Sequence, residues 1–164
     1  MSALEVALPT RRETRRLGAR LASLLRPGDV VVLEGPLGAG KTFLVRAIAR
    51  GLGVPQREPI TSPTFALVHE ITSGRVPLTH ADLYRLGDAS ELDALGLPEA
   101  LARSVGVVEW GARFASTIAD DGIVLELAGR DDERGRRATI SARGPRGEEL
   151  VERLTPPRRF SDGL

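Results

Sequence analysis

Residues 35–42 read GPLGAGKT and match in full the pattern G-x-x-x-x-G-K-[ST] of a phosphate-binding loop. The residues before it, VVVLE (30–34), form a short, continuous apolar run with several β-branched side chains, which is typical of a buried parallel strand. The residues after it, TFLVRAIARGLG, have helical spacing and predict a helix that ends at Gly51 or Gly53. A strand, a glycine-rich loop and a helix in this order are the context that the motif requires.

The loop residues predict a site for the phosphates of a nucleotide. Glycines let the backbone wrap around phosphate without clashes at Cβ, and the following helix adds the positive end of its dipole. Lys41 is the only lysine among 23 basic residues, and its compact ammonium group can reach the β- and γ-phosphates where an arginine fork would be too bulky. Thr42 offers a hydroxyl to Mg²⁺. The predicted nucleotide-binding residues of the loop are Gly35, Pro36, Leu37, Gly38, Ala39, Gly40, Lys41 and Thr42.

Composition excludes several other kinds of site. The chain has 164 residues, no cysteine and two histidines, which excludes disulfides, thiolate catalysis and Cys-ligated zinc and argues against a histidine-rich metal site. The net charge of +1 gives no general attraction to nucleic acid or membranes. No apolar run approaches the ~18 residues of a transmembrane helix, and the N-terminus lacks a secretory signal. We therefore expect a cytoplasmic protein with one domain at 1–154 and a flexible tail at 155–164.

The remaining pattern predicts an α/β fold, namely a single P-loop domain with a largely parallel sheet flanked by helices and with some antiparallel strands. Thr10 and Glu13 have the spacing of a capping box at the start of an amphipathic helix that ends near Pro27. Further elements are predicted as strands at 4–8, 64–71, 76–84 and 105–110, a late hairpin at 123–128 and 137–143, helical pieces over 88–103 and a last helix at 148–154.

Two absences favour adenine over guanine as the base. GTPases of the Ras type recognise guanine through an N-K-x-D motif, but this chain contains no asparagine and no second lysine. DALG (93–96) matches the D-x-x-G of such proteins, but it falls within a helical stretch and we interpret the match as accidental. A stretch like the LSGGQ signature of transporter ATPases is absent as well.

Two predicted strands carry carboxylates that suit a metal ion or a water molecule. In THADLYR the strand period places His80, Asp82 and Tyr84 on one side, and Asp82 would hold Mg²⁺ or its water shell. VVEW is an apolar strand that ends in a carboxylate, and Glu109 would bind the metal indirectly or orient the attacking water. The alternative for each residue is an ordinary carboxylate at a strand end.

A hydroxyl-rich segment, TSPTF (61–65), precedes the first of these strands. Its proline biases Ser62 toward extended backbone, and such a loop would sense the γ-phosphate as a switch, with Thr64 among the nucleotide-binding residues. A capped turn before a strand is the alternative. Trp110, the only tryptophan, would lie near the nucleotide if Glu109 does, and core packing is the alternative there.

Arginines recur on the first predicted helix. Arg12, Arg16 and Arg20 have the i, i+4 spacing of one helix face, with Arg15 beside them. Most such stripes are solvated surfaces, and the alternative is a surface for a protein partner or RNA.

Four segments in this order and spacing, GPLGAGKT, ITSPTFALVHE, THADLYRL and VVEWGAR, resemble the TsaE family of small bacterial ATPases in the tRNA threonylcarbamoyladenosine (t6A) pathway. The resemblance implies a P-loop α/β domain that binds ATP and Mg²⁺ and works with the TsaB–TsaD pair. In that pair TsaD transfers the threonylcarbamoyl group to adenosine 37 of tRNAs that read ANN codons. A TsaE-like subunit would not make that bond, and its ATP hydrolysis would reset the complex between turnovers.

The resemblance also implies roles for individual residues. Lys41 and Thr42 would hold phosphate and metal, Asp82 would serve the metal, and Glu109 would serve water or metal. Thr14 matches the family's N-terminal E-T pair, in a region that lies near the adenine.

Three positions depart from the usual pattern of the family. Pro36 stands where the family has Asp, Phe43 where it often has a second Thr, and Ile71 where it tends to have Tyr. Pro36 lacks an N–H group and so removes one potential phosphate donor.

Two other functions are compatible with the same loop. A small-molecule kinase would need an acceptor pocket and usually a mobile arginine-bearing lid, which RDDERGRR (130–137) could imitate. A nucleotide-gated binding module would bind ATP without depending on its turnover.

Overall fold

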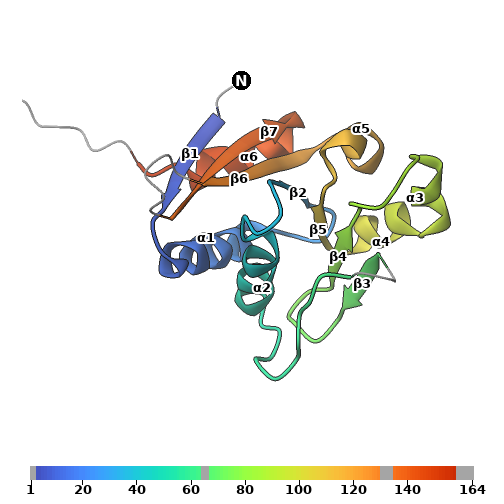
Figure 1. Ribbon diagram of the computed structural model, residues 1–164, viewed down its shortest axis with the longest axis horizontal. Coiled ribbons are helices and arrows are strands. Elements are labelled where there is room, and N and C mark those ends of the chain that lie inside the picture. The colour runs from blue at the N-terminus through green and yellow to red at the C-terminus, as the bar shows by residue number, and fades with distance from the viewer. Residues whose placement is uncertain (1–2, 64–66, 130–134, 158–164) are drawn as a thin grey trace, which may run out of the picture.

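A mixed sheet of seven strands runs through the structure. The computed structural model describes residues 3–63, 67–129 and 135–157. The strands are β1 (Ala3–Leu8), β2 (Val30–Glu34), β3 (Val68–Ile71), β4 (Leu78–Asp82), β5 (Val105–Glu109), β6 (Gly122–Gly129) and β7 (Arg136–Arg143). Their order is β1-β7-β6-β2-β5-β4-β3, with parallel pairing from β6 to β4 and antiparallel pairing at both edges (Figure 1). The predicted α/β class is confirmed, with the parallel strands at the centre.

Helices cover both faces of this sheet. One face carries α1 (Arg11–Leu24), α2 (Lys41–Gly51) and α6 (Gly144–Leu154). The other carries α3 (Ser90–Ala94), α4 (Leu97–Arg103), the 3₁₀ turn η1 (Ala112–Phe114) and α5 (Ala115–Ile118). Within the described ranges, no helix is long and apolar enough to cross a membrane.

Strand β2 separates the two halves of the core, because successive side chains of a strand point to opposite faces. Val31 and Leu33 pack with apolar side chains of α1, α2 and α6. Val30 and Val32 pack with those of α3, α4 and α5. Both sets are buried, so β2 is apolar on both sides, as the continuous run VVVLE predicts for a central parallel strand.

The N-terminus of α1 is capped as its sequence predicts. Thr10 Oγ1 accepts a hydrogen bond from the Arg12 N–H group at 3.2 Å, and the Glu13 carboxylate accepts one from the Thr10 N–H group at 2.9 Å. A further hydrogen bond from the Thr10 hydroxyl lowers the pKa of Glu13 below its ordinary value. The capped helix ends at Leu24, close to the predicted end near Pro27.

Two glycines let α1 and α2 approach each other closely. A Cβ atom on Gly18 would lie 2.4 Å from Cβ of Ala47, and one on Gly51 would lie 2.6 Å from Cβ of Ala22. Any larger side chain at these positions would push the two helices apart. Because α2 begins at the phosphate-binding loop, this contact also sets the position of that loop relative to α1.

The late hairpin is confirmed as β6 and β7, but the last helix begins earlier than predicted. α6 starts at Gly144 rather than at Glu148. The carboxylate of Asp121, just before β6, accepts hydrogen bonds from the N–H groups of Arg146 at 3.2 Å and Gly147 at 2.9 Å. A cap from so distant a part of the chain satisfies the first turn without leaving a local sequence signal.

The strands around the hydroxyl-rich segment are shorter than predicted. β3 begins at Val68 and β4 ends at Asp82, so Tyr84 lies beyond the strand and does not continue its alternation. The Tyr84 N–H group instead donates a hydrogen bond to Asp82 Oδ1 at 3.0 Å, which turns the chain. Residues 64–66 of the predicted strand and 158–164 of the predicted tail lie outside the described residues.

We expect Gly18→Leu to lower the free energy of unfolding by about 3 kcal/mol, because the new side chain would overlap α2. Ala19→Leu places the same side chain at the exposed neighbouring position and should change stability by less than about 0.5 kcal/mol. Urea denaturation of both variants, followed by circular dichroism, measures the difference. Equal stability of the two variants would contradict the close contact.

Candidate functional site

The phosphate-binding loop joins β2 to α2 at the carboxyl end of the central parallel strands (Figure 1). Gly35 has a φ of 140°, and a Cβ atom there would lie 2.4 Å from the carbonyl oxygen of Leu127, so only glycine fits against β6. Gly40, with a φ of 100°, ends the loop as the N-cap of α2. The loop therefore leads directly into a helix N-terminus, whose free N–H groups favour an anion.

The side chain of Lys41 is folded into this loop. It is 6% exposed, and Nζ donates hydrogen bonds to the carbonyl oxygens of Gly35 at 2.5 Å and Pro36 at 3.1 Å. Nζ also lies 4.1 Å from the ring centroid of Trp110, within cation–π distance. The ammonium group is thus held by neutral carbonyls and an aromatic ring, and none of these contacts neutralises its charge.

Burial lowers the pKa of Lys41 below its ordinary value, because desolvation disfavours the charged form. The nearby carboxylates of Glu109, Glu34 and Asp82 act in the opposite direction and favour the charged form. A cation beside carboxylates at the end of a sheet suits the joint binding of phosphate groups and a divalent cation.

Strands β4 and β5 bring the two predicted carboxylates together. Asp82 and Glu109 are partners in the register of these parallel strands, so their side chains leave the same face at the carboxyl edge. Thr42 reaches the same place from α2, where its hydroxyl donates a long hydrogen bond of 3.4 Å to Glu109 Oε1. Three residues from three separate motifs thus meet at one edge of the sheet.

The hydroxyl-rich segment makes contact with this edge through Ser62. Its hydroxyl donates a hydrogen bond of 2.7 Å to Asp82 Oδ2. The other carboxylate oxygen, Asp82 Oδ1, accepts a hydrogen bond from the N–H group of Tyr84. The segment predicted as a switch is therefore bonded to the carboxylate predicted to serve the metal. Thr64, predicted to bind nucleotide, lies outside the described residues.

A buried histidine, for which the sequence predicts no role, holds Glu109. The side chains of His80 and Glu109 are 0% and 3% exposed, and His80 Nε2 lies 2.6 Å from Glu109 Oε2. His80 Nδ1 is buried without a hydrogen-bond partner among the described residues. An ionised carboxylate only accepts hydrogen bonds, so the Nε2–H group of His80 is the donor to Glu109 in its ionised form. The H-x-D spacing was the available signal, since it places His80 and Asp82 on the same face.

Trp110 follows Glu109 in an unusual backbone conformation. Its φ is +58°, a left-handed value that is rare for a bulky residue, and its N–H group donates to the carbonyl oxygen of Leu33 at 2.9 Å. Its ring centroid lies 4.9 Å from that of Tyr84. The turn places the indole over Lys41, as expected for a tryptophan near the phosphate loop, and away from the core.

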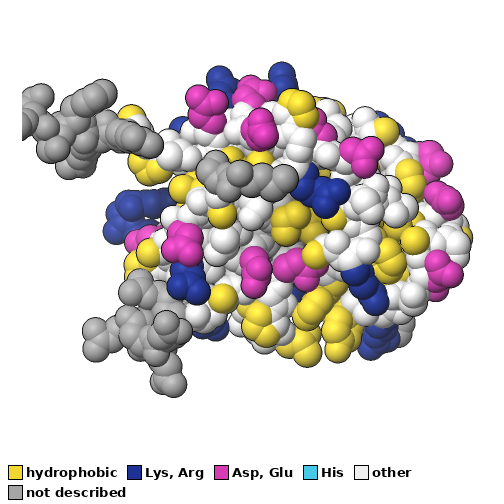
Figure 2. Space-filling view, turned by 90° about the horizontal axis from the view of Figure 1, so that it is seen from above, with side chains coloured by type: hydrophobic (Ala, Val, Ile, Leu, Met, Phe, Trp, Pro, Cys, Tyr) yellow, Lys and Arg dark blue, Asp and Glu magenta, His cyan; other side chains and the backbone are white. Residues whose placement is uncertain are grey.

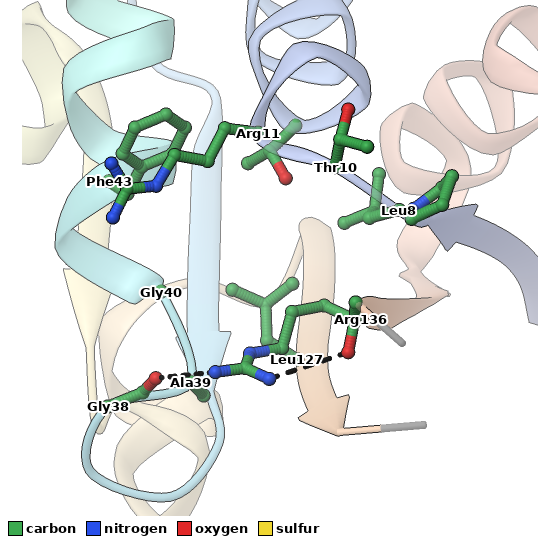
Figure 3. Close-up of a pocket in the computed structure, with 12 residues that line it drawn as sticks. Leu8, Thr10, Arg11, Gly38, Ala39, Gly40, Phe43, Leu127 and Arg136 are labelled. Carbon is green, nitrogen blue, oxygen red and sulfur yellow. Dashed lines mark hydrogen bonds between the residues drawn. The ribbon is translucent and has the colours of Figure 1, made fainter. Parts of the chain in front are cut away.

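A cavity of about 400 Å³ opens beside the phosphate-binding loop (Figure 3). Its apolar walls come from residues such as Leu8, Phe43 and Leu127, and Thr14 lies among its lining residues, where the resemblance implies adenine. Figure 3 shows Arg136 reaching from β7 toward the loop, where its guanidinium donates to the carbonyl oxygen of Gly38 at 3.3 Å. The cavity adjoins the phosphate-binding loop, and its volume lies within the range of sites for small molecules.

The described residues contain no group of three or more His, Asp or Glu side chains that would hold a metal ion by itself. Instead of such a group, Thr42, Asp82 and Glu109 offer one hydroxyl and two carboxylates. Mg²⁺ is commonly bound by so few protein groups when phosphate oxygens and water complete its octahedron. The residues therefore fit Mg²⁺ bound together with a nucleotide rather than a free ion.

Comparison with known proteins confirms the resemblance that the motifs indicate. The family described as "Threonylcarbamoyl adenosine biosynthesis protein TsaE" matches residues 8–138. Two relatives named tRNA threonylcarbamoyladenosine biosynthesis protein TsaE are similar to this chain. The protein of Streptomyces coelicolor is 44% identical over 138 residues, which cover 80% of this chain and 92% of that one. The protein of Bacillus subtilis is 40% identical over 146 residues, which cover 87% and 88%.

The fold has a matching solved structure as well. The crystal structure of YdiB from Bacillus subtilis superposes with a TM-score of 0.76 at 32% sequence identity, and the match covers 93% of this chain and 94% of that one. The family match and the structural match thus cover the loop, both carboxylate strands and the α1 region.

We expect His80→Ala to lower the free energy of unfolding by about 3 kcal/mol, because it leaves the buried carboxylate of Glu109 without its donor. His80→Gln keeps an N–H donor of similar reach and should restore part of the loss. Chemical denaturation of the two variants at pH 7 measures the difference. If His80→Gln is no more stable than His80→Ala, the hydrogen bond is not the cause.

A second expectation concerns the indole above Lys41. Phosphate in the loop should draw Nζ away from the ring and change the fluorescence of Trp110, the only tryptophan of the chain. Titration of the chain with ATP while following tryptophan emission tests this and yields a dissociation constant. Tyr84→Phe, which keeps the aromatic neighbour, is the control, and its response should be unchanged. An emission spectrum unaffected by saturating ATP would contradict the expectation.

Proposed function

The chain belongs to the TsaE family, and from this premise we propose that it is the ATP-binding and ATP-hydrolysing subunit required for t6A modification of tRNA. The observation that carries the proposal is the meeting of the phosphate loop, with its buried Lys41, and the carboxylates of Asp82 and Glu109. The names of the relatives support the pathway. The site geometry supports nucleotide chemistry.

The proposed nucleotide is ATP, bound along the loop from Gly35 to Thr42. Its phosphates would lie against the loop N–H groups and Lys41, which would exchange its carbonyl partners for phosphate oxygens. Adenine would enter the cavity that contains Thr14. Pro36 has no N–H group to donate to phosphate. Its carbonyl oxygen instead accepts a hydrogen bond from Lys41.

Mg²⁺ would be held by Thr42, Asp82 and Glu109 together with the nucleotide, and would supply neutralisation of the phosphate charge. Glu109 would orient the attacking water through Oε1, because Oε2 is engaged by His80. Water attacks the γ-phosphorus, the bond to the β–γ bridging oxygen breaks, and ADP and inorganic phosphate leave. Lys41 would stabilise the charge that develops on the transferred group.

The hydrogen bond from Ser62 to Asp82 supports a switch role for residues 61–65. A metal ion bound with the γ-phosphate would compete with the Ser62 hydroxyl for the Asp82 carboxylate, so the segment would change its contacts when ATP is hydrolysed. This gives ATP turnover a way to alter a neighbouring protein surface.

The proposed partners follow from the family. The chain would act with a TsaB–TsaD-type complex in the cytoplasm, reach tRNA through that complex and reset it between turnovers, while TsaD transfers the group. Because the proposed role of hydrolysis is to reset that complex, we expect phosphate release by the isolated chain to be weak.

A small-molecule kinase is the second candidate, and one observation favours it. Arg136 belongs to the arginine-rich stretch 130–137 predicted as a possible lid, and it lies at the phosphate loop, where it donates a hydrogen bond to the carbonyl oxygen of Gly38. Residues 130–134 of that stretch lie outside the described residues. A kinase would transfer the γ-phosphoryl group to an acceptor hydroxyl instead of to water. Glu109, at the end of its strand beside Thr42, is better explained by hydrolysis.

The test is phosphate release from ATP in the presence of Mg²⁺, measured for the chain alone and with a TsaB–TsaD pair. We expect weak release that rises with the pair and is absent in Lys41→Ala. ATP binding without release in either condition would contradict hydrolysis and would favour the kinase or a passive binding module.

We expect Glu109→Gln to bind ATP but to release phosphate about 100-fold more slowly, because the amide cannot act on the attacking water as a carboxylate does. Lys41→Arg keeps the charge but should bind ATP more weakly, since the bulkier fork does not fit the buried slot. Tryptophan fluorescence and phosphate release separate the two effects. Normal turnover by Glu109→Gln would remove Glu109 from the proposed mechanism.

A further inference from the structure

Helices α1 and α2 together carry a concentration of positive charge. Their arginines are Arg11, Arg12, Arg15, Arg16, Arg20, Arg46 and Arg50, and the only acidic residue on either helix is Glu13. All except the half-buried Arg50 are exposed. The whole chain has a net charge of only +1, so this face is basic because acidic residues are placed elsewhere. Figure 2, by contrast, shows basic and acidic side chains interspersed over the face that it presents.

Within the part of the chain that the structure describes, these arginines lack carboxylate partners. Among the described residues, none of the seven lies within 4 Å of a carboxylate, whereas Arg103 pairs with Glu70 at 2.5 Å and Arg146 with Asp29 at 2.8 Å. Arg20, Arg46 and Arg50 do donate hydrogen bonds, but only to backbone carbonyls: Arg20 to that of Arg153, and the other two to those of residues 54–60. Neutral acceptors leave the full positive charge in place. The charge of this face is therefore available to an external anion.

The two helices form a cleft between these arginines. Its volume is about 480 Å³, and we call it the arginine cleft; its lining residues are Arg15, Ala19, Phe43, Arg46, Ala47, Arg50, Gly51 and Gln56. Its lining combines three arginines with the small residues Ala19, Ala47 and Gly51, where α1 and α2 approach closely. A groove lined by arginines and small uncharged residues fits a phosphodiester chain.

Phe43 is the residue that connects the cleft to the nucleotide cavity, since it lines both. The guanidinium carbons of Arg11 and Arg15 lie 5.5 Å and 5.6 Å from its ring centroid. Both arginines therefore lie within cation–π distance of the ring, a contact that uses none of their N–H donors.

From these observations we infer that the arginine cleft binds the phosphate backbone of RNA. Guanidinium groups donate paired hydrogen bonds to phosphate, and clustered arginines release counterions when a polyanion binds. An acidic protein surface would meet the same charge, but the half-buried aromatic ring of Phe43 between arginines also suits a base or ribose. The inference takes the RNA to be tRNA on the strength of the proposed function, and it deepens that proposal by adding a direct contact.

The experiment is binding of an unmodified tRNA transcript to the full chain, followed by fluorescence anisotropy over a series of salt concentrations without ATP or partner proteins. We expect the logarithm of affinity to fall steeply with the logarithm of salt. Arg15→Gln and Arg46→Gln, which remove two exposed arginines of the cleft, should each weaken binding severalfold and lower that slope by about one unit. Arg103→Gln removes an exposed arginine that is already paired with Glu70, and it should bind tRNA like the parent chain.

The inference would be overturned by tRNA binding that is unaffected by Arg15→Gln and Arg46→Gln, or by no tRNA binding at ~50 mM salt. Displacement of tRNA by polyglutamate at lower concentrations than by inorganic polyphosphate would also overturn it, in favour of an acidic protein partner.

Phosphate release by the same variants separates this inference from the proposed function. If the arginine variants lose tRNA but hydrolyse ATP normally, hydrolysis does not depend on the cleft. If the parent chain binds tRNA but never hydrolyses ATP, only the proposed function fails.

Discussion

The burial of one ammonium group organises the end of the sheet. Lys41 has lost most of its water, and it is retained by two loop carbonyls, an indole ring and the field of three carboxylates. Those contacts exist only if the loop leaves β2 tightly, and Gly35 permits this by packing its backbone against β6. They also require α2 to start where it does, and its close contact with α1 keeps it there. The loop, both helices and the strand ends are thus linked by the need to accommodate a single charge.

The order of strands explains why the chemistry lies at this edge. Parallel neighbours end at the same level, so β4 and β5 deliver Asp82 and Glu109 as a pair beside the loop that follows β2. The residue before each carboxylate, Ala81 or Val108, faces the opposite half of the core. The alternation of side chains along β4 and β5 therefore places apolar residues in one core and the two carboxylates on the opposite face, beside the loop. The fold and the site both follow from this alternation.

The sequence alone predicts the parts of this arrangement that depend on local pattern. The phosphate loop, the capping box at Thr10 and the carboxylates of Asp82 and Glu109 are read from residues that are close in the chain. The hydrogen bond between His80 and Glu109 cannot be predicted in this way, because it depends on the register of two strands that are far apart in sequence. The early start of α6, capped by Asp121, and the arginine cleft are missed for the same reason. Spacing within one element is visible in a sequence, whereas contacts between elements require the fold.

The internal contacts of Lys41 bear on how tightly the proposed nucleotide would be bound. To reach a phosphate, Nζ would give up two hydrogen bonds to loop carbonyls and its place over Trp110. These contacts would compete with the ligand for the same ammonium group. The affinity of the loop for a nucleotide would therefore be lower than that of a loop whose lysine had no internal partners.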